Sequence, residues 1–469
     1  MDYLGFNAYE KSINRKGSAL VFMIKDEEGD ALIVQGKNPG FKGAKLPRKR
    51  IRAPLNHYNA KVLRKVFPFT APSQVLGEDR SFGVGDRLGI ASVGHIRIFE
   101  RYDAYPVLAQ QSIRELHLTN RTYEDVLDAA SFAVFREGFK KKWGADGDHL
   151  KTAADIKYAL SLGFTMITLD CSEHIKTNIT EENAPPLPLG CAEKYLNRTF
   201  DIGEKQVLSF TEAELKKIAA TYGEAIYFAY EIYTRVIKNA KTPADFEISI
   251  DETTFPTSPL EHYFIARELI DAGVEFVTIA PRFCGEFQKG IDYIGSLSQF
   301  ENEIKIHAMI ARHFDYKLSI HSGSDKFSVF PLIGKETKGV FHVKTAGTNW
   351  LEAIRVVAME NPGLYKEIHR YALQAFGEAA KYYNIKADIK KIPNINKLND
   401  KQLPALLNND DCRQMIHISY GFILSRKNED GTFTFRDRLY KLWREKEEAY
   451  SKALSKHIGR HLELLRVRR

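Results

Sequence analysis

The sequence is poor in cysteine, and the spacing of its cysteines excludes two common kinds of scaffold. The four cysteines are widely separated and form no Cys-x-x-Cys pair; they are Cys171, Cys191, Cys284 and Cys412. A disulfide framework or a structural zinc ribbon needs paired or regularly spaced cysteines. We therefore expect four reduced thiols and a fold that is held together by its hydrophobic core.

Long apolar runs and blocks of one charge are also missing. No stretch approaches the roughly 18 apolar residues of a membrane span, and the N-terminus lacks the ordered regions of a secretory signal. The net charge is +8, but the basic residues are interspersed with 60 acidic ones, which is typical of a mixed charged surface. We expect a cytoplasmic protein with neither a membrane nor a nucleic-acid partner.

A glycine fingerprint for dinucleotides is absent as well. No Gly-x-Gly-x-x-Gly lies between a predicted strand and a predicted helix, and "FGVGD" is a poor substitute. This counts against a nicotinamide-dependent reaction, because such cofactors place their pyrophosphate on that turn.

What the sequence does contain is a regular alternation of short β-branched or aromatic runs with segments of helical period. This alternation predicts repeated βα units and a (β/α)8 barrel of the TIM type, with a doubly wound open sheet as the alternative. The predicted strands are Pro106–Gln111, Lys140–His149, Thr165–Asp170, Phe246–Asp251, Phe276–Ala280, Lys317–His321, Val340–Lys344 and Met415–Tyr420. Helices are predicted at Thr152–Leu162, Pro259–Ala272, Ser298–Phe314 and Trp350–Glu360.

The chain divides into three parts on this pattern. Residues 1–100 form an N-terminal extension with a β-hairpin and a glycine-rich entry segment, 101–434 form the barrel, and 435–469 form a charged helical tail. Long insertions interrupt the barrel at 175–239 and 384–413. Loops of this length either cover the active site of a barrel or form contacts between subunits. The sequence is therefore compatible with a homo-oligomer.

Polar residues alternate with apolar ones along three of the predicted strands, so that one face of each strand is polar. Lys317, Ser319 and His321 share a face of one strand, and His342 and Lys344 share a face of the next. In "FEISID" the same holds for Glu247, Ser249 and Asp251. A polar face toward the barrel axis indicates an interior that holds water or a metal.

Three histidines, His149, His321 and His342, are expected at or near the carboxyl ends of their strands. Catalytic side chains of barrels gather at that end, and imidazole is the commonest metal ligand. We therefore predict a divalent metal cation at these histidines, with zinc, manganese, iron, cobalt and nickel all compatible.

Carboxylates and cations complete the predicted site. Asp148 and Glu252 are the predicted acid-base pair, and Asp170 is an alternative to either of them. A small anionic substrate would be gripped by basic and hydroxyl side chains. The predicted substrate-binding residues are Lys151, Arg282, Ser322, Lys326, Lys344 and, from the entry segment, Arg80.

The segments "WGADGDHLKT", "GFTMITLD" and "IHSGSDKF", together with "GEDRSFGVGDRLG", resemble the tagaturonate/fructuronate epimerase family, also called hexuronate C4-epimerases. "GADGDHL" is also similar to a segment of noncatalytic tagatose-bisphosphate aldolase subunits, and the Asp-His pair with later histidines is similar to the metal site of class II aldolases. The resemblance implies a metal-dependent barrel enzyme of sugar-acid catabolism.

Chemistry supports this expectation. Carbon 4 of a 2-ketose acid does not adjoin the ketone, so epimerisation there is simplest by breaking and remaking the bond between carbons 3 and 4. We expect an epimerase that interconverts D-tagaturonate and D-fructuronate. A metal-dependent ketose aldolase or isomerase and a non-catalytic barrel subunit are the alternatives.

Overall fold

Eight parallel strands close into a barrel, so the expected (β/α)8 fold is confirmed and the open sheet is excluded. The computed structural model describes residues 1–27, 29–345, 347–383 and 385–469. In sheet order the barrel strands are β10 (Gly144–Leu150), β11 (Met166–Asp170), β14 (Asp245–Ser249), β15 (Thr278–Ala280), β16 (Lys317–Ile320), β17 (Phe341–Thr345), β8 (Arg80–Val84) and β9 (Tyr105–Ser112).

One predicted strand was wrong, and a segment predicted to lie outside the barrel takes its place. Met415–Tyr420 lies in helices, not in a strand, and β8 comes from the glycine-rich entry segment. A Cβ at Gly83 of β8 would lie 1.9 Å from Oε1 of Gln110, so a larger residue here would force that buried side chain to move. The barrel strands therefore run from Arg80 to Thr345, whereas we had placed them within 101–434.

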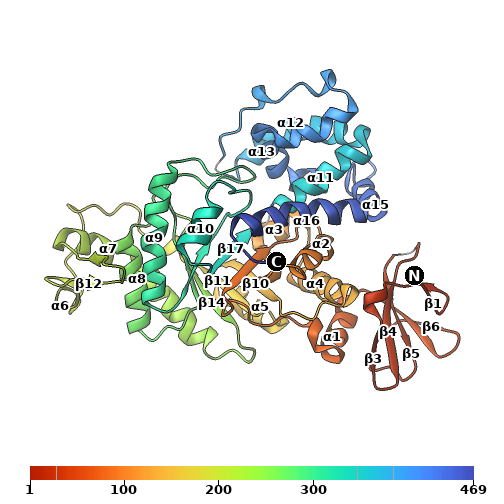
Figure 1. Cartoon of the computed structure of the whole chain (residues 1–469), viewed down its shortest axis with the longest axis horizontal. Coiled ribbons are helices and arrows are strands. Elements are labelled where there is room, and N and C mark those ends of the chain that lie inside the picture. Colours follow the sequence, from red (N-terminus) through yellow and green to blue (C-terminus); the bar gives the residue numbers. More distant parts are fainter. Residues whose placement is uncertain (28, 346, 384) are drawn as a thin grey trace.

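Helices surround the barrel and extend from it on several sides (Figure 1). The α-helices before residue 320 are α1 (His57–Val66), α2 (Ser92–Phe99), α3 (Ile113–Thr119), α4 (Tyr123–Glu137), α5 (Ala153–Leu162), α6 (Cys191–Tyr195), α7 (Glu212–Ile232), α8 (Pro259–Asp271) and α9 (Leu297–His313). The later ones are α10 (Phe330–Glu336), α11 (Thr348–Glu360), α12 (Pro362–Ala380), α13 (Asp410–Ile418), α14 (Tyr420–Ser425), α15 (Arg436–Glu445) and α16 (Glu447–Leu464).

The helix after β10 shows how local sequence fixes these elements. Thr152 caps α5 by accepting a hydrogen bond from the Asp155 amide, and Gly163 ends the helix in the left-handed region with φ 99°. Both are standard helix-end signals. They place the polar residues at the end of β10 in the short turn before α5.

The extension forms its own antiparallel sheet at one end of the molecule (Figure 1). Its strands, in sheet order, are β3 (Asn14–Lys16), β4 (Ala19–Ile24), β5 (Ala31–Gln35), β7 (Arg50–Pro54) and β6 (Ala44–Leu46). Two-stranded ribbons are formed by β1 (Asp2–Tyr3) with β2 (Phe6–Asn7) and by β12 (Phe200–Asp201) with β13 (Val207–Leu208).

The rest of the chain consists of the two predicted insertions and the C-terminal tail. The segment 175–239 carries α6, the β12–β13 ribbon and α7, and lies between β11 and β14. The second insertion, 384–413, begins at Asn384, which is outside the described residues. The tail forms α15 and α16, and α16 packs against α2 and α11. In the described part of the chain no helix has the length and apolar character needed to span a membrane.

Candidate active site

A cleft opens at the carboxyl ends of the barrel strands. A cavity of about 350 Å³ there contains Asp148, His149, His321 and Lys344 in its wall. A second cavity of about 240 Å³ adjoins it. The two share Arg114, Asp251, Glu252, Lys289, His321 and Ser322, so they form one cleft.

A larger cavity, of about 640 Å³, lies between the N-terminal sheet, α4 and α15. None of the predicted metal-binding or acid-base residues lines it. We assign the active site to the smaller cleft because barrel enzymes place their chemistry at the carboxyl ends of the strands.

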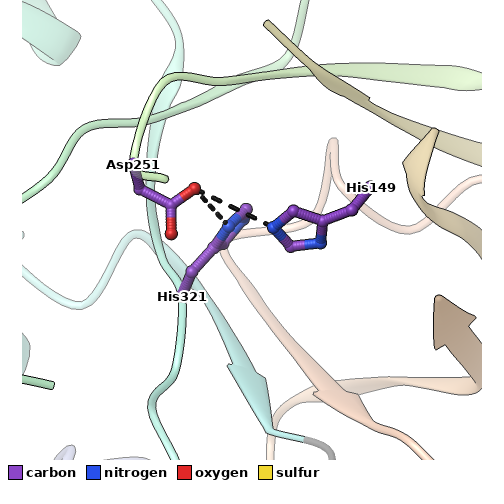
Figure 2. A group of neighbouring side chains, drawn as sticks. All are labelled: His149, Asp251 and His321. Carbon is purple, nitrogen blue, oxygen red and sulfur yellow. Dashed lines mark hydrogen bonds and ion pairs between the residues drawn. The ribbon is translucent and has the colours of Figure 1, made fainter. Parts of the chain in front are cut away.

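Two histidines and an aspartate converge at the centre of this cleft. Nδ1 of His321 lies 3.1 Å from Oδ1 of Asp251, and Nε2 of His149 lies 3.9 Å from the same oxygen. Figure 2 shows both rings directed toward this carboxylate. One ligand atom from each residue lies within 4.8 Å of the others, which is close enough to share a single cation.

The remaining nitrogen of each ring is held by a carboxylate. Asp148 Oδ1 is 2.8 Å from His149 Nδ1, and Glu247 Oε1 is 2.8 Å from His321 Nε2. A carboxylate behind a metal-binding imidazole fixes the ring and strengthens it as a ligand. This donor set fits a divalent cation, because two imidazoles and one carboxylate leave coordination positions free for substrate.

The field around the two rings also favours a cation. Burial acts to lower the pKa of His149, but the Asp148 carboxylate outweighs it and raises the pKa well above the ordinary value. At His321 the carboxylates of Asp251 and Glu247 likewise outweigh burial and raise the pKa. Positive charge is therefore stabilised at the place where the three side chains meet.

The backbone that presents these side chains is locally unusual. His149 has φ 53° and Ser322, next to His321, has φ 50°. The register of β10 against β11 also shifts between Gly147 and Leu150. Left-handed conformations at residues other than glycine and irregular strand ends cost free energy and concentrate at functional sites.

Lys344 connects the acidic residues beneath the cleft. Its Nζ lies 2.7 Å from Asp146, 2.5 Å from Asp148 and 3.4 Å from Glu247. Burial acts to raise the pKa of Asp148, but Lys344 and His149 outweigh it and hold the pKa well below its usual range. Asp148 is therefore an anion at neutral pH.

His342 does not join the cluster, so the ligand set predicted from the sequence changes at this position. Its Nδ1 lies 2.9 Å from Oγ of Ser81, and burial lowers its pKa to about 3, so the ring is neutral. His342 is in register with Ser319 and Ser81, two residues before Lys344 at the end of β17. It thus lies deeper in the barrel, and Asp251 takes its place beside the other two histidines.

Most of the predicted acid-base and substrate-binding residues line the cleft, and two lie outside it. Glu252, Lys151, Arg282 and Ser322 line the cleft with Asp148 and Lys344, as does the alternative carboxylate Asp170. Within the described residues, no donor bonds the Glu252 carboxylate, and its side chain is exposed.

Two predicted substrate-binding residues lie outside the cleft. Arg80 pairs with Asp103 at the amino end of β8, which is the opposite end of the barrel. Lys326 is fully buried, and its Nζ donates to the backbone carbonyls of Gln288, Ile291 and Ser324. Neither side chain reaches the cavity.

Other cleft residues were not predicted to be functional. Lys289 lies in the long loop between β15 and α9, and Arg114 lies at the start of α3. The signal for Arg114 was its place directly after a predicted strand, in "QQSIRE". Lys289 follows its strand by nine residues, so no spacing rule indicated it.

Comparison with known proteins agrees with this architecture. A family model described as tagaturonate epimerase matches residues 9–465. A tagaturonate/fructuronate epimerase from Thermotoga maritima is 42% identical over 477 residues, which cover 98% of this chain and 97% of the relative. The native crystal structure of fructuronate-tagaturonate epimerase from Cohnella laeviribosi is 46% identical with a TM-score of 0.96, covering 99% of this chain and 97% of that one. A complex of the Cohnella protein with one glycerol gives the same identity and coverage and a TM-score of 0.95.

Proposed function

The chain belongs to the tagaturonate epimerase family, and from this premise we propose that it interconverts D-tagaturonate and D-fructuronate by metal-assisted cleavage and re-formation of one carbon–carbon bond. The observation that carries the mechanism is the convergence of His149, Asp251 and His321 on one point in a cleft that Asp148 and Glu252 also line.

The two substrates differ only at carbon 4, counting the ketone as carbon 2 and the carboxylate as carbon 6. The hydrogen on carbon 4 is not acidic, because the ketone is two bonds away. Cleavage between carbons 3 and 4 leaves an enediolate on carbons 1 to 3 and an aldehyde at carbon 4. Rotation of the aldehyde and renewed attack by carbon 3 on its other face gives the epimer.

The proposed metal ligands are His149, Asp251 and His321, with Asp251 in place of the His342 expected from sequence. A divalent cation bound there supplies Lewis-acid polarisation of the substrate carbonyl. Asp148 and Glu247 hold the two imidazoles in orientation through their second nitrogens. Zinc, manganese, iron, cobalt and nickel all suit this mixture of nitrogen and oxygen ligands.

The proton transfers are assigned to Asp148 and Glu252. Asp148 is deprotonated at neutral pH and can accept the proton of the carbon-4 hydroxyl. Glu252 lies in the wall of both parts of the cleft and can return a proton when the bond re-forms. In the reverse direction the two carboxylates exchange roles.

The test is an assay of chelator-treated protein reloaded with each metal in turn, with D-tagaturonate as substrate and D-fructuronate as the measured product. We expect activity to be lost on chelation and restored by at least one of the five metals. If the reloaded protein converts neither uronate, the proposed function is wrong.

The ligand set is tested separately by metal content. Asp251→Asn should lose most of the bound metal, because it removes a charged ligand. His342→Ala should retain it, since His342 contacts Ser81 below the cluster. Equal occupancy of the two variants would show that the ligands are misassigned.

A further inference from the structure

The cations around the cleft divide into two groups. On the side of the metal cluster, Lys344 pairs with Asp146, Asp148 and Glu247. Arg87 pairs with Glu115, and Lys151 pairs with Glu173 and Asp170. These charges are already balanced by the protein.

The second group has no such balance. Within residues 1–27, 29–345, 347–383 and 385–469, no carboxylate forms an ion pair with Arg114, Arg282 or Lys289. All three line the part of the cleft that extends beyond His321 toward Tyr382 and Tyr383. The Arg114 guanidinium lies over the Tyr383 ring, 5.1 Å from its centroid. Among the described residues, this end of the cleft therefore holds three cations without an ion-pair partner, in the same wall as the carboxylates of Asp251, Glu252 and Glu286.

Lys289 is the most constrained of these cations. Its Nζ donates to Oγ of Ser322 at 3.1 Å, directly beside His321. Burial and the nearby Arg114 lower its pKa, and the carboxylates of Glu252 and Glu115 oppose this shift only in part. A lysine beside another cation is stabilised further when an anion binds between the two.

The loop that carries Lys289 is held from behind by buried donors. Lys326 donates to the carbonyls of Gln288 and Ile291, and Arg413 donates to that of Gly290. Gln414 donates to the carbonyl of Lys289 itself. With the loop carbonyls engaged in this way, the Lys289 side chain is left to line the cleft. This explains why Lys326 is buried away from the substrate.

We propose that Lys289 and Arg114, with Arg282 beside them, bind the carboxylate of the hexuronate and thereby retain the aldehyde fragment while the carbon–carbon bond is open. The inference rests on the proposed function. It fixes the direction of the substrate, with the ketone at the metal cluster and carbon 6 at these cations. The carboxylate is four carbons from the ketone, so the two ends need separate subsites in one cleft.

The chemistry explains why such an anchor is needed. When the bond between carbons 3 and 4 breaks, its electron pair stays on carbon 3 and the carbon-4 hydroxyl gives up its proton. Carbons 4 to 6 then form a separate three-carbon aldehyde acid. This fragment must turn about the bond between carbons 4 and 5 without leaving, and its only charged group is the carboxylate. A cationic anchor holds that end while the aldehyde rotates, which separates an epimerase from an aldolase.

The experiment compares Lys289→Met and Arg114→Met with wild-type protein loaded with metal. We expect the KM for D-tagaturonate to rise about tenfold or more, as for loss of a charge-assisted hydrogen bond. We also expect three-carbon fragments to appear in solution during turnover, measured by coupled assays for the aldehyde and ketone products. Lys289→Arg should restore most of the wild-type behaviour, because it keeps the charge.

A neutral substrate and a matched variant make the test specific. The kcat/KM for a ketohexose, which has a hydroxymethyl group in place of the carboxylate, should change less than about twofold in Lys289→Met. Lys335→Met removes a cation that is paired with Glu301 outside the cleft and 51% exposed, and it should leave both substrates unaffected. Equal losses with acid and neutral substrates, without released fragments, would overturn the proposal.

Binding of an inert acid separates this inference from the function itself. D-galactonate is a six-carbon acid without a ketone, so its calorimetric affinity reports the anchor even if the protein converts neither uronate. Weaker binding to Lys289→Met than to wild type is expected. Unchanged or undetectable binding to both proteins would contradict the anchor.

Discussion

Whether a histidine of this cleft can bind a metal depends on which of its ring nitrogens already contacts a carboxylate of the protein. His321 is fixed between Glu247 on one side and Asp251 on the other, at 2.8 and 3.1 Å. Glu247 is fully buried and also accepts a hydrogen bond from Thr278. The position of the His321 ring is thus set by a residue that does not itself line the cleft.

Glu247→Gln tests this dependence. The amide keeps the shape of the side chain but removes the charge behind His321, so metal affinity should fall about 10- to 100-fold. Metal titration of the apo protein measures it. The control is Glu301→Gln, because the Glu301 carboxylate pairs with Lys335 outside the cleft. Identical metal affinities of the two variants would contradict the role of Glu247.

Lys317 gives the stability a pH dependence that does not involve the proposed metal site. It is buried, its Nζ donates to the Glu78 carbonyl and to Oγ of Ser81, and burial lowers its pKa from 10.5 to about 7. Between these values the unfolded chain binds more protons than the folded one, so the free energy of unfolding rises with pH in this window. The destabilising effect is fully present below about pH 7.

Lys317→Met should remove this dependence. Relative to the variant, the wild type should gain up to about 1.4 kcal/mol per pH unit between about pH 7 and 10.5. Urea unfolding at several pH values measures the difference, with the surface variant Lys241→Met as baseline. A difference that is flat with pH would contradict a lowered pKa.

Among the elements, the loop between β16 and α10 links the cleft to the C-terminal helices. It begins with His321 and Ser322, and three residues further on Asp325 forms a 2.8 Å ion pair with Arg413 of α13. Oδ1 of Asp325 is 3.0 Å from Nε2 of His457 on α16, and its backbone N–H donates to Nε2 of His461. Two helices distant in sequence therefore hold the loop that presents a proposed metal ligand.

Asp325→Asn should therefore lower the free energy of unfolding. It leaves Arg413 buried without its charge partner, and such changes cost about 3–5 kcal/mol. Urea unfolding measures the loss, and faster hydrogen exchange is expected in residues 321–329. Glu367→Gln breaks an arginine pair that is about half exposed and should change stability by less than about 1 kcal/mol. Similar losses in the two variants would contradict the anchoring role.

The misassigned elements show where sequence patterns fail. "MIHISY" alternates like a strand, but all six residues are buried, five of them in helices and Ser419 in the turn between α13 and α14. Alternation carries no information when every side is covered. Asn409 caps α13 ahead of two aspartates, and this helix-start signal preceded the strand pattern. β8 was missed because it lies in a segment rich in glycine, which is depleted in strands.

At the scale of the whole molecule, the N-terminal extension is joined to the barrel through a shared core. Phe132 and Phe135 of α4 pack in one cluster with strands β4, β5 and β7 and with α1. The Phe135 ring lies 5.2 Å from that of Phe67. Arg136, next along α4, also forms a 2.5 Å ion pair with Glu447 of α16. We expect the extension and the barrel to unfold together.

Phe135→Ala tests this coupling. Phe135 is fully buried, so its truncation should cost about 3–5 kcal/mol and make the extension more sensitive to limited proteolysis. Tyr227→Ala, at a side chain that is 60% exposed, should have little effect. Cleavage of the extension at the same rate in both variants would show that it folds independently.

The sequence by itself determined the barrel, most of its strands and the chemical character of its mouth. Strand alternation and helix-end signals act over a few residues, so they can be read without the tertiary structure. His149, His321, Asp148 and Glu252 were identified because they end or follow strands, and the ends of parallel strands meet at one edge.

Only the tertiary structure decided which residues touch. It put Asp251 rather than His342 beside the two histidines, because a shift of two residues along a strand moves a side chain to another layer of the barrel. It also separated the cations that are paired with carboxylates from Arg114, Arg282 and Lys289. Charge balance depends on distances between segments far apart in the chain, and such distances are set by how the strands close and how the loops pack over them.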